Sequence, residues 1–338
     1  MYKSGNLEHQ LIKKIITNED KLYDFDFKNL DFENLVKISS EQLIITTLYK
    51  HLEKFEKKVP AKFYSYIKEL NKINHERNLV LLKELEEISN ILNVNKIEHV
   101  FIKGSACLIF GIYKSVGDRL IGDIDILVSE KDFPNTVKIF KKNQYKTKKD
   151  YEFFKDINHH YPRMTKDGKL FAIEIHRKIL KTKNYYLNTT EILRNKTLIN
   201  NLFVPSYVDS FLICIYNYQI NDFGNTYLSY NYRTIYDTIL LFQKGSFVFP
   251  SFDNKILSNF FFIISSIGIQ NFEGKINYSK NSISRLRIQL RNKLALTFKI
   301  EYFFFNKIFF LKTRFKQIKM IIGNKDYLKY VIKKLFSD

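Results

Sequence analysis

Residues 122–128 read Gly-Asp-Ile-Asp-Ile-Leu-Val, and this stretch decides the fold that we expect for the chain. Acidic and apolar side chains alternate along it, which predicts a β-strand. Asp123 and Asp125 then project from one face of the strand, and the isoleucines cover the other. Two neighbouring carboxylates repel each other unless a cation lies between them. The stretch therefore predicts a strand that presents two ligands to a metal ion.

A turn upstream of this strand predicts a phosphate-binding element. Lys103, Gly104 and Ser105 follow a short apolar strand expected at residues 99–102, and they lead into a helix expected from about Ala106. The unpaired N–H groups at the start of a helix attract phosphate oxygens, and a glycine lets a phosphate approach the backbone. The Ser105 hydroxyl adds a donor, and Lys103 adds positive charge.

A third carboxylate is expected on a neighbouring strand. Residues 171–176 read as a strand, and Glu174 and His176 lie on one face of it. Asp167-Gly168 precedes this strand and predicts a hairpin with residues 159–164. Mg²⁺ suits the three carboxylates, because it takes hard oxygen ligands and binds through carboxylates together with substrate phosphates. Two such ions roughly 3.5–4 Å apart would activate an attacking oxygen and stabilise departing pyrophosphate.

Residues from about Asn78 to Lys178 resemble the uncharacterised bacterial nucleotidyltransferase family of the polymerase-beta superfamily. That family has a helix, a strand, Lys-Gly, an arginine, an Asp-x-Asp strand and an acid-x-His strand, in this order. Here the pattern is carried by Lys103-Gly104, Arg119, Asp123-Ile124-Asp125 and Glu174-Ile175-His176.

The resemblance implies an α+β fold, in which a small mixed-sheet nucleotidyltransferase core is flanked by N-terminal and C-terminal helical regions. It implies Mg²⁺, with two ions, and a nucleoside triphosphate (NTP) as partners. Asp123 and Asp125 would hold both metals, and Glu174 would ligate one and orient or deprotonate the acceptor. Arg119 would steady the triphosphate or the Asp-x-Asp loop; the alternative is a salt bridge with Asp118 or the catalytic acids.

The acceptor site is expected near three further residues. His176 would contact the acceptor or brace Glu174 by a hydrogen bond. His159 and His160 should point to opposite faces of their strand, so only one of them, taken as His160, can face the site. Asp237 matches a helical acid of the same family and would line the acceptor pocket, or else be solvated or paired with Arg233. In the preceding helix, residues 216–219 read Tyr-Asn-Tyr-Gln where the family often has a histidine.

Composition favours a globular protein with a basic surface. The chain has 338 residues, of which 45% are hydrophobic and 16% aromatic, and its formal net charge is +20. Cys107 and Cys214 have no metal or redox spacing, which excludes a disulfide framework. The first residues lack the pattern of a secretory signal, and no apolar run is long enough to cross a bilayer, so we expect a cytoplasmic protein.

Three regions are expected along the chain: an N-terminal helical region at 1–95, the catalytic core at 96–185, and a basic helical region at 186–338. Asp132 and Pro134 predict a helix that runs to about Lys142, residues 145–178 should carry the remaining strands, and residues 179–202 are expected as a polar connector. Helices are predicted at 207–219, at 232–243, and from 284 to 336 with a break at Gly323-Asn324. Residues 280–338 hold 15 Lys or Arg against three acids. This excess favours a nucleic acid or an anionic membrane surface as a partner, which includes peripheral binding at the inner membrane surface. The alternative is a core helix with a solvated basic face that binds neither.

The resulting hypothesis is a transferase that moves a nucleoside monophosphate from an NTP to an unidentified acceptor, with release of pyrophosphate. A sugar, a glycan precursor, another small molecule or a peptide would suit this reaction. Two alternatives remain: a toxin-like nucleotidyltransferase acting on transfer RNA, and a non-catalytic nucleotide-binding or scaffold protein with the same fold.

Overall fold

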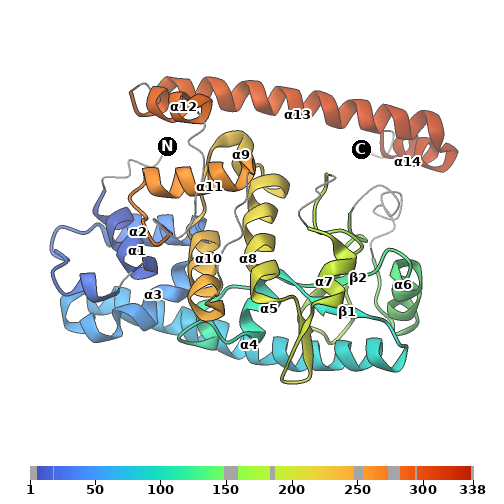
Figure 1. The fold of residues 1–338 in the computed structure, drawn as a ribbon, viewed down its shortest axis with the longest axis horizontal. Helices are drawn as coiled ribbons and strands as arrows, with labels where there is room; N and C mark the ends of the chain where they lie inside the picture. Colours follow the sequence, from blue (N-terminus) through green and yellow to red (C-terminus); the bar gives the residue numbers. More distant parts are fainter. Residues whose placement is uncertain are drawn as a thin grey trace.

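The strand predicted at residues 122–128 forms the centre of a small mixed sheet. Strand β2 (Asp123–Val128) pairs antiparallel with β1 (His99–Phe101) and parallel with β3 (Ala172–His176). The computed structural model describes residues 6–17, 19–147, 159–182, 187–246, 254–272, 282–293 and 295–335. Helices surround this sheet, so the α+β class is confirmed (Figure 1).

The predicted hairpin at Asp167-Gly168 is present. Met164 and Ile173 exchange both backbone hydrogen bonds, each of 2.9 Å, and Gly168 takes a positive φ of 77° in the turn between them. A positive φ is free of steric cost for glycine, which explains why the chain reverses here. Residues 148–158, where we also expected strand, lie outside the described residues.

The elements next to the catalytic turn differ slightly from expectation. Helix α5 (Lys103–Ile109) begins at Lys103 rather than Ala106, so the whole Lys-Gly-Ser turn belongs to its first turn. Helix α6 (Phe133–Lys142) lies where Asp132 and Pro134 predicted it and packs against β3. It thus covers one face of the sheet.

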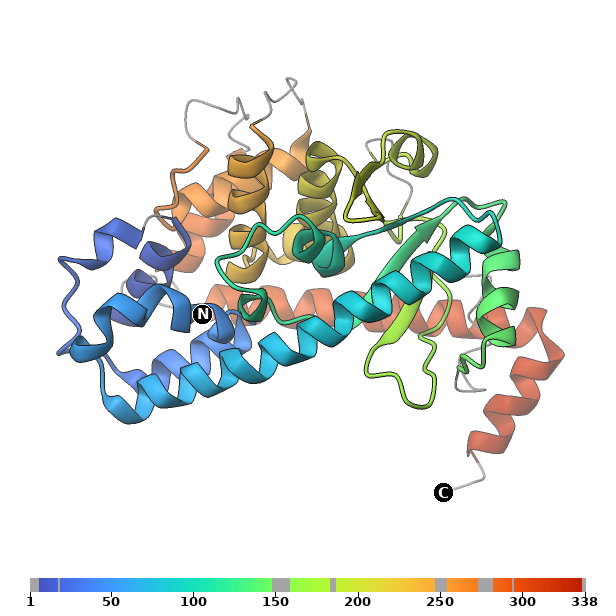
Figure 2. The same ribbon diagram turned by 90° about the horizontal axis from the view of Figure 1, so that it is seen from below.

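The N-terminal region is helical, as expected. Its helices are α1 (Leu7–Thr17), α2 (Phe32–Glu41), α3 (Ile45–Leu52) and α4 (Ala61–Val94), with 3₁₀ turns η1 (Glu19–Leu22) and η2 (Glu53–Lys58) between them. Helix α4 runs along one side of the molecule, and Figure 2 shows it crossing from the N-terminal helices to the sheet. Buried residues of this region and of the sheet belong to one hydrophobic cluster.

Three asparagines of α4 fix the loop that carries Arg119. Asn71, Asn74 and Asn78 are buried, and their spacing of three and four residues places them on one face of the helix. The Asn71 amide donates to the Asp118 carboxylate at 3.0 Å. The amides of Asn74 and Asn78 donate to backbone carbonyl groups in and next to the turn η3 (Val116–Asp118), including the Arg119 carbonyl, at 2.6–3.0 Å. These bonds satisfy backbone groups that the loop cannot pair by itself.

Close packing of this loop on α4 also requires a glycine. A Cβ atom on Gly117 would lie 2.5 Å from the Asn71 carbonyl oxygen, closer than real contacts allow. The loop therefore lies directly against the helix backbone.

The C-terminal region contains a small hairpin that we did not predict. Residues 179–202 were expected as a polar connector, but they include α7 (Thr189–Arg194), β4 (Thr197–Ile199) and the start of β5 (Leu202–Val204). Asn200 and Asn201 form the two-residue loop, both with positive φ. Asparagine tolerates this conformation, so the Asn-Asn pair was the signal available in the sequence.

The following helices close over the sheet. They are α8 (Tyr207–Tyr216), the π-helical turn η5 (Asn217–Asn221), α9 (Gly224–Tyr227), α10 (Tyr232–Gly245) and α11 (Lys255–Ser266). Helix α8 packs against α5 and α10, and α10 also packs against α1. The predicted helices at 207–219 and 232–243 are thus confirmed, and they link the N-terminal helix α1 to the core.

The last helices form an arm across the top of the molecule in Figure 1. They are α12 (Ser282–Lys293), α13 (Ala295–Gly323) and α14 (Lys325–Leu335), and the predicted break at Gly323-Asn324 separates α13 from α14. No helix in the described ranges is both long and apolar enough to cross a lipid bilayer.

The α4 asparagines lead to a first prediction. Asn78→Ala should leave the Val116 carbonyl without its donor and remove one of the two donors to the Arg119 carbonyl, which costs about 1–3 kcal/mol of unfolding free energy. Urea unfolding would measure the loss. Lys68→Ala, on the exposed side of the same helix, is the control and should change stability by about 0.5 kcal/mol or less. Equal losses in the two variants would contradict this role.

Candidate active site

A cavity of about 250 Å³ lies where the sheet meets the C-terminal helices. The residues predicted from the sequence that line it are Lys103, Gly104, Arg119, Asp123, Asp125 and Asp237. The C-terminal region adds Cys214, Asn217, Asp222, Arg233 and Thr234. Groups from distant parts of the sequence therefore form one polar cavity.

Glu174 lies beside the aspartates. The parallel pairing of β2 and β3 places it in register with Asp125, so the two side chains leave the sheet on the same face. Oxygen atoms of Asp125 and Glu174 and a ring nitrogen of His176 lie within 4.8 Å of one another. Asp123, two residues before Asp125, projects from the same face of β2. The strand pairing thus gathers three carboxylates.

Lys103 forms an ion pair inside this group. Its Nζ atom lies 2.7 Å from Oδ1 of Asp125, and its backbone adopts a left-handed φ of 58°. That conformation costs a non-glycine residue roughly 1–3 kcal/mol. Burial alone would lower the pKa of Lys103, but Asp125, with Glu174 and Asp123, raises it overall. The ammonium group is therefore charged and held at the carboxylates.

His176 contacts the same aspartate from the other side. Its ring is fully buried, and Nε2 lies 2.8 Å from Oδ1 of Asp125 but 3.7 Å from Oε2 of Glu174. We expected it to contact the acceptor or to brace Glu174. The structure gives it a closer partner, and the hydrogen bond fixes the orientation of Asp125.

The carboxylates differ in their affinity for protons. Burial, followed by repulsion from Asp125 and Glu174, raises the pKa of Asp123 to about 6. Burial would also raise the pKa of Asp125, but Lys103 and His176 lower it overall. Burial would also raise the pKa of Glu174, but the neighbouring rings of His176 and His160 together lower it overall. Asp123 is therefore the carboxylate whose negative charge is least compensated by neighbouring positive groups.

Arg119 and Asp237 form a buried ion pair. The guanidinium Nε lies 3.1 Å from both carboxylate oxygens, and NH2 lies 2.9 Å from Oδ2. The Tyr113 hydroxyl donates to the same carboxylate at 2.8 Å. The salt bridge expected for Arg119 exists, but its partner is Asp237 rather than Asp118, and Asp237 is neither solvated nor paired with Arg233.

Gly104 and Ser105 occupy different environments. Gly104 lines the cavity, where a Cβ atom would lie 3.3 Å from Ile121 and 3.6 Å from the Arg119 guanidinium. Ser105 is 1% exposed, and its hydroxyl has no hydrogen-bond partner in the part of the chain that the structure describes. Unlike Gly104, Ser105 is not among the residues that line the cavity.

His159 and His160 do not separate as expected. Both rings lie against His176, with centroids 5.5 and 5.0 Å from it. The expectation of opposite faces was wrong because this segment is no regular strand: it meets β3 only through isolated bridges, at His160 and at Met164. Burial, together with repulsion among the three rings, lowers the pKa of His159 and of His160, so these two rings are neutral at pH 7.

Sequence reasoning missed the contribution of residues 217–234. Asn217 begins the π-helical turn, and Asp222 follows it directly, so the irregular end of α8 aims both toward the cavity. Turns of this kind are frequent at functional sites, but a single sequence does not reveal them. Arg233, considered only as a partner of Asp237, lines the cavity itself.

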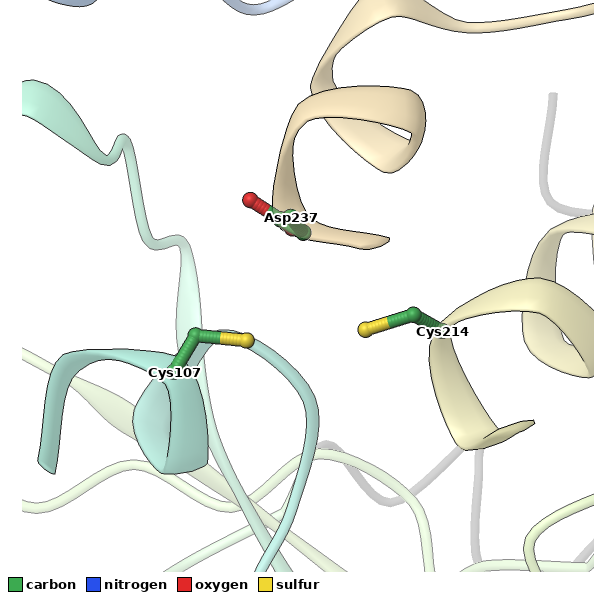
Figure 3. A group of neighbouring side chains, drawn as sticks. All are labelled: Cys107, Cys214 and Asp237. Carbon is green, nitrogen blue, oxygen red and sulfur yellow. The ribbon is translucent and has the colours of Figure 1, made fainter. Parts of the chain in front are cut away.

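The two cysteines meet Asp237 at the edge of the cavity. Figure 3 shows the thiol groups of Cys107 of α5 and Cys214 of α8 pointing toward each other, with Asp237 of α10 beside them, and one ligand atom from each of the three lies within 4.8 Å of the others. Asp237 is already engaged by Arg119 and Tyr113, whose guanidinium and hydroxyl hold its two oxygens. A cation here would lie beside a guanidinium, so the cluster is an unfavourable metal site.

Comparison with known proteins identifies the family of the chain. A family described as "Uncharacterised nucleotidyltransferase" matches residues 28–257, which is more than half of the chain. The match begins before α2 and ends within α11, so it covers the sheet and every residue of the cavity. No curated protein matches the chain. With its carboxylates, its Lys-Gly turn and this match, the chain belongs to the uncharacterised nucleotidyltransferase family.

Proposed function

We propose that the protein is a Mg²⁺-dependent nucleotidyltransferase, and the convergence of Asp123, Asp125 and Glu174 beside a cavity is the observation that carries the proposal. An acceptor oxygen attacks the α-phosphorus of an NTP, a new P–O bond forms, and the bond to the β-phosphate breaks with release of pyrophosphate. Glu174 orients the acceptor hydroxyl or takes its proton. The enzyme works mainly by positioning and by neutralising charge.

The carboxylates fit Mg²⁺. They supply hard oxygen ligands, and the raised pKa of Asp123 indicates that positive charge is lacking next to it. Asp123, Asp125 and Glu174 would hold the ion, with a second ion as the family resemblance implies. Bound Mg²⁺ would neutralise phosphate charge and activate the attacking oxygen. Lys103 and His176 meanwhile fix the orientation of Asp125.

The phosphate side of the cavity fits an NTP. Gly104 lets a phosphate approach closely, and Lys103 offers an ammonium. Arg119 is shared with Asp237, so its contribution to the triphosphate is electrostatic. In this proposal Asp237, His160 and His176 contribute to the acceptor side.

The acceptor that we favour is a sugar, a glycan precursor, another small molecule or a peptide, since the cavity is small and is lined in part by residues of α8 and α10. Transfer RNA is the alternative, and it would contact the basic C-terminal region. A non-catalytic protein would gain nothing from crowding three acids, because their repulsion costs stability unless they bind a cation.

A second proposal concerns the arm formed by α12–α14, for which we favour an anionic membrane surface. Seven large apolar residues, all at least 44% exposed, recur every three or four positions along α13. They are Ile300, Phe304, Ile308, Leu311, Phe315, Ile318 and Ile322. The opposite side of α13 faces the body of the protein, where Phe309 stacks near Phe223 at 4.4 Å.

Basic side chains flank this apolar stripe on both edges. At 100° per residue, Lys307 and Arg314 lie along one edge, and Lys312 and Lys319 along the other. A second copy of the chain would bring like charges together at both edges, which disfavours self-pairing. Lipid headgroups of negative charge would complement them, with long side chains reaching to the headgroups. Aliphatic residues in the stripe suit acyl chains better than nucleotide bases.

The site electrostatics lead to a stability prediction. The pKa of Asp123 is raised, so its ionisation destabilises the fold progressively from about pH 4 to about pH 6, and the full penalty is present at pH 7. Asp123→Asn should therefore stabilise the metal-free protein at pH 7, by about 1–2 kcal/mol after allowance for partial exposure. The pKa of Asp125 is lowered, so Asp125→Asn should destabilise it.

Thermal unfolding in EDTA at pH 7 would measure both changes. Asp167→Asn, at the exposed hairpin turn, is the matched control and should be neutral. Adding Mg²⁺ should raise the wild-type melting temperature and remove the advantage of Asp123→Asn. A metal-free Asp123→Asn protein less stable than wild type would contradict the proposed crowding of charge.

The catalytic proposal predicts the loss of transfer. Replacing Asp123 and Asp125 together by asparagine should abolish transfer of label from α-labelled NTPs to acceptors in a cell extract, because the ligands for the metal are lost. Circular dichroism would verify the fold, and Asp167→Asn again serves as control. Full turnover in the double variant would refute the mechanism. A labelled product that is transfer RNA would select the RNA alternative.

The membrane proposal predicts binding to anionic vesicles. The protein should sediment with phosphatidylglycerol vesicles but not with phosphatidylcholine vesicles, and salt should weaken the binding. Phe304→Ser with Phe315→Ser should reduce it about tenfold or more, because two exposed apolar anchors are lost. Leu198→Ser, an exposed apolar residue of β4, is the control. Equal binding by both variants would refute the proposal.

A further inference from the structure

Arg233 is a cation in the cavity without a direct partner. It lies in the first turn of α10 and lines the cavity together with Lys103, Asp123 and Thr234. Among the residues that the structure describes, it makes no hydrogen bond or ion pair, and no carboxylate approaches its guanidinium to salt-bridge distance. The other two cationic groups of the cavity, Lys103 and Arg119, each have a carboxylate partner.

Three features of its surroundings make this charge unfavourable. Arg233 is only partly exposed, so its guanidinium has lost much of its hydration. Arg119, another cation, lies nearby and, after burial, is the main cause that lowers the pKa of Arg233. The start of a helix also carries a partial positive charge, which disfavours a cation in its first turn. A bound anion would therefore stabilise the charge of Arg233.

The acids of the cavity do not supply that anion. Asp237 is held by Arg119 and Tyr113, and Asp125 by Lys103 and His176. Asp222 attracts Arg233 at longer range only, and burial raises its own pKa. Asp123 and Glu174 belong to the cation site. The charge of Arg233 is thus left for a ligand.

We propose that Arg233 binds the triphosphate of the nucleotide, so that the C-terminal helical region completes a phosphate site begun by Lys103 and Gly104. The inference rests on the proposed nucleotidyl transfer and names the group that holds the leaving phosphates. A guanidinium suits this role because its planar set of N–H donors can bind two phosphate oxygens at once. Metal-ligand carboxylates on the core and Arg233 on α10 then face the substrate from two sides of the cavity.

Binding of inorganic tripolyphosphate tests this directly. Isothermal titration in the presence of Mg²⁺ would compare wild type with Arg233→Ala and Arg233→Lys. Arg233→Ala should weaken binding about 10- to 100-fold, because a charge-assisted, two-pronged hydrogen bond is lost. Arg233→Lys should fall between the two, since lysine keeps the charge but loses the planar donor set. The affinities of the three proteins for each NTP should follow the same order.

The matched control is Arg194→Ala, which removes the same charge from an exposed position on α7. It should bind tripolyphosphate like wild type. A melting temperature measured without ligand separates binding from folding: Arg233→Ala should be unchanged or more stable than wild type, because it relieves repulsion with Arg119. If Arg233 served only to stabilise the fold, Arg233→Ala would instead lower the melting temperature.

The outcomes distinguish this inference from the proposed function. If wild type binds tripolyphosphate and Arg233→Ala binds it equally well, the role of Arg233 is refuted and nucleotidyl transfer stands. If Arg233→Ala loses affinity for inorganic monophosphate but not for tripolyphosphate or NTPs, Arg233 serves another anion and the triphosphate assignment is overturned. If wild type binds neither tripolyphosphate nor any NTP, both proposals fail.

Discussion

The buried ion pair between Arg119 and Asp237 is the interaction on which the cavity depends. It joins the loop before β2 to α10, and thus the sheet to the C-terminal helices. Neither charge could remain buried alone, because a desolvated ion without a partner costs several kcal/mol. The asparagines of α4 hold the same loop from the other side through its carbonyl groups. Arg119 is therefore fixed between two helical regions, and the cavity opens beside it.

Charges in the cavity are arranged for ligands rather than for stability. Lys103 and Arg119 each neutralise one acid, whereas Asp123 and Arg233 lack direct partners among the described residues. A cation near Asp123 and an anion near Arg233 would complete the pairing. Functional sites commonly carry such local costs, and the rest of the fold compensates them. An NTP with Mg²⁺ supplies both signs of charge in one substrate.

The arm formed by α12–α14 differs from the rest of the protein in the exposure of its apolar residues. The sheet and the helices around it bury their apolar residues in one cluster, but α13 leaves a continuous apolar stripe exposed. Basic residues beside the stripe oppose pairing with a second copy and favour an anionic surface. The family match ends before this arm, at residue 257. In our proposal, the residues that catalyse nucleotidyl transfer and those that bind the membrane surface thus lie in different parts of the chain.

The sequence by itself determined the local features of this protein. Alternation at residues 122–128 and 171–176, the Asp167-Gly168 turn and the break at Gly323-Asn324 all act over a few residues, so they were predicted correctly. Tertiary structure alone decided the pairing of charges. Arg119 meets Asp237, His176 turns to Asp125, and Arg233 stays without a partner, because strand register and helix packing bring together groups that no local spacing relates. The sequence indicated which groups do chemistry; long-range packing chose their neighbours.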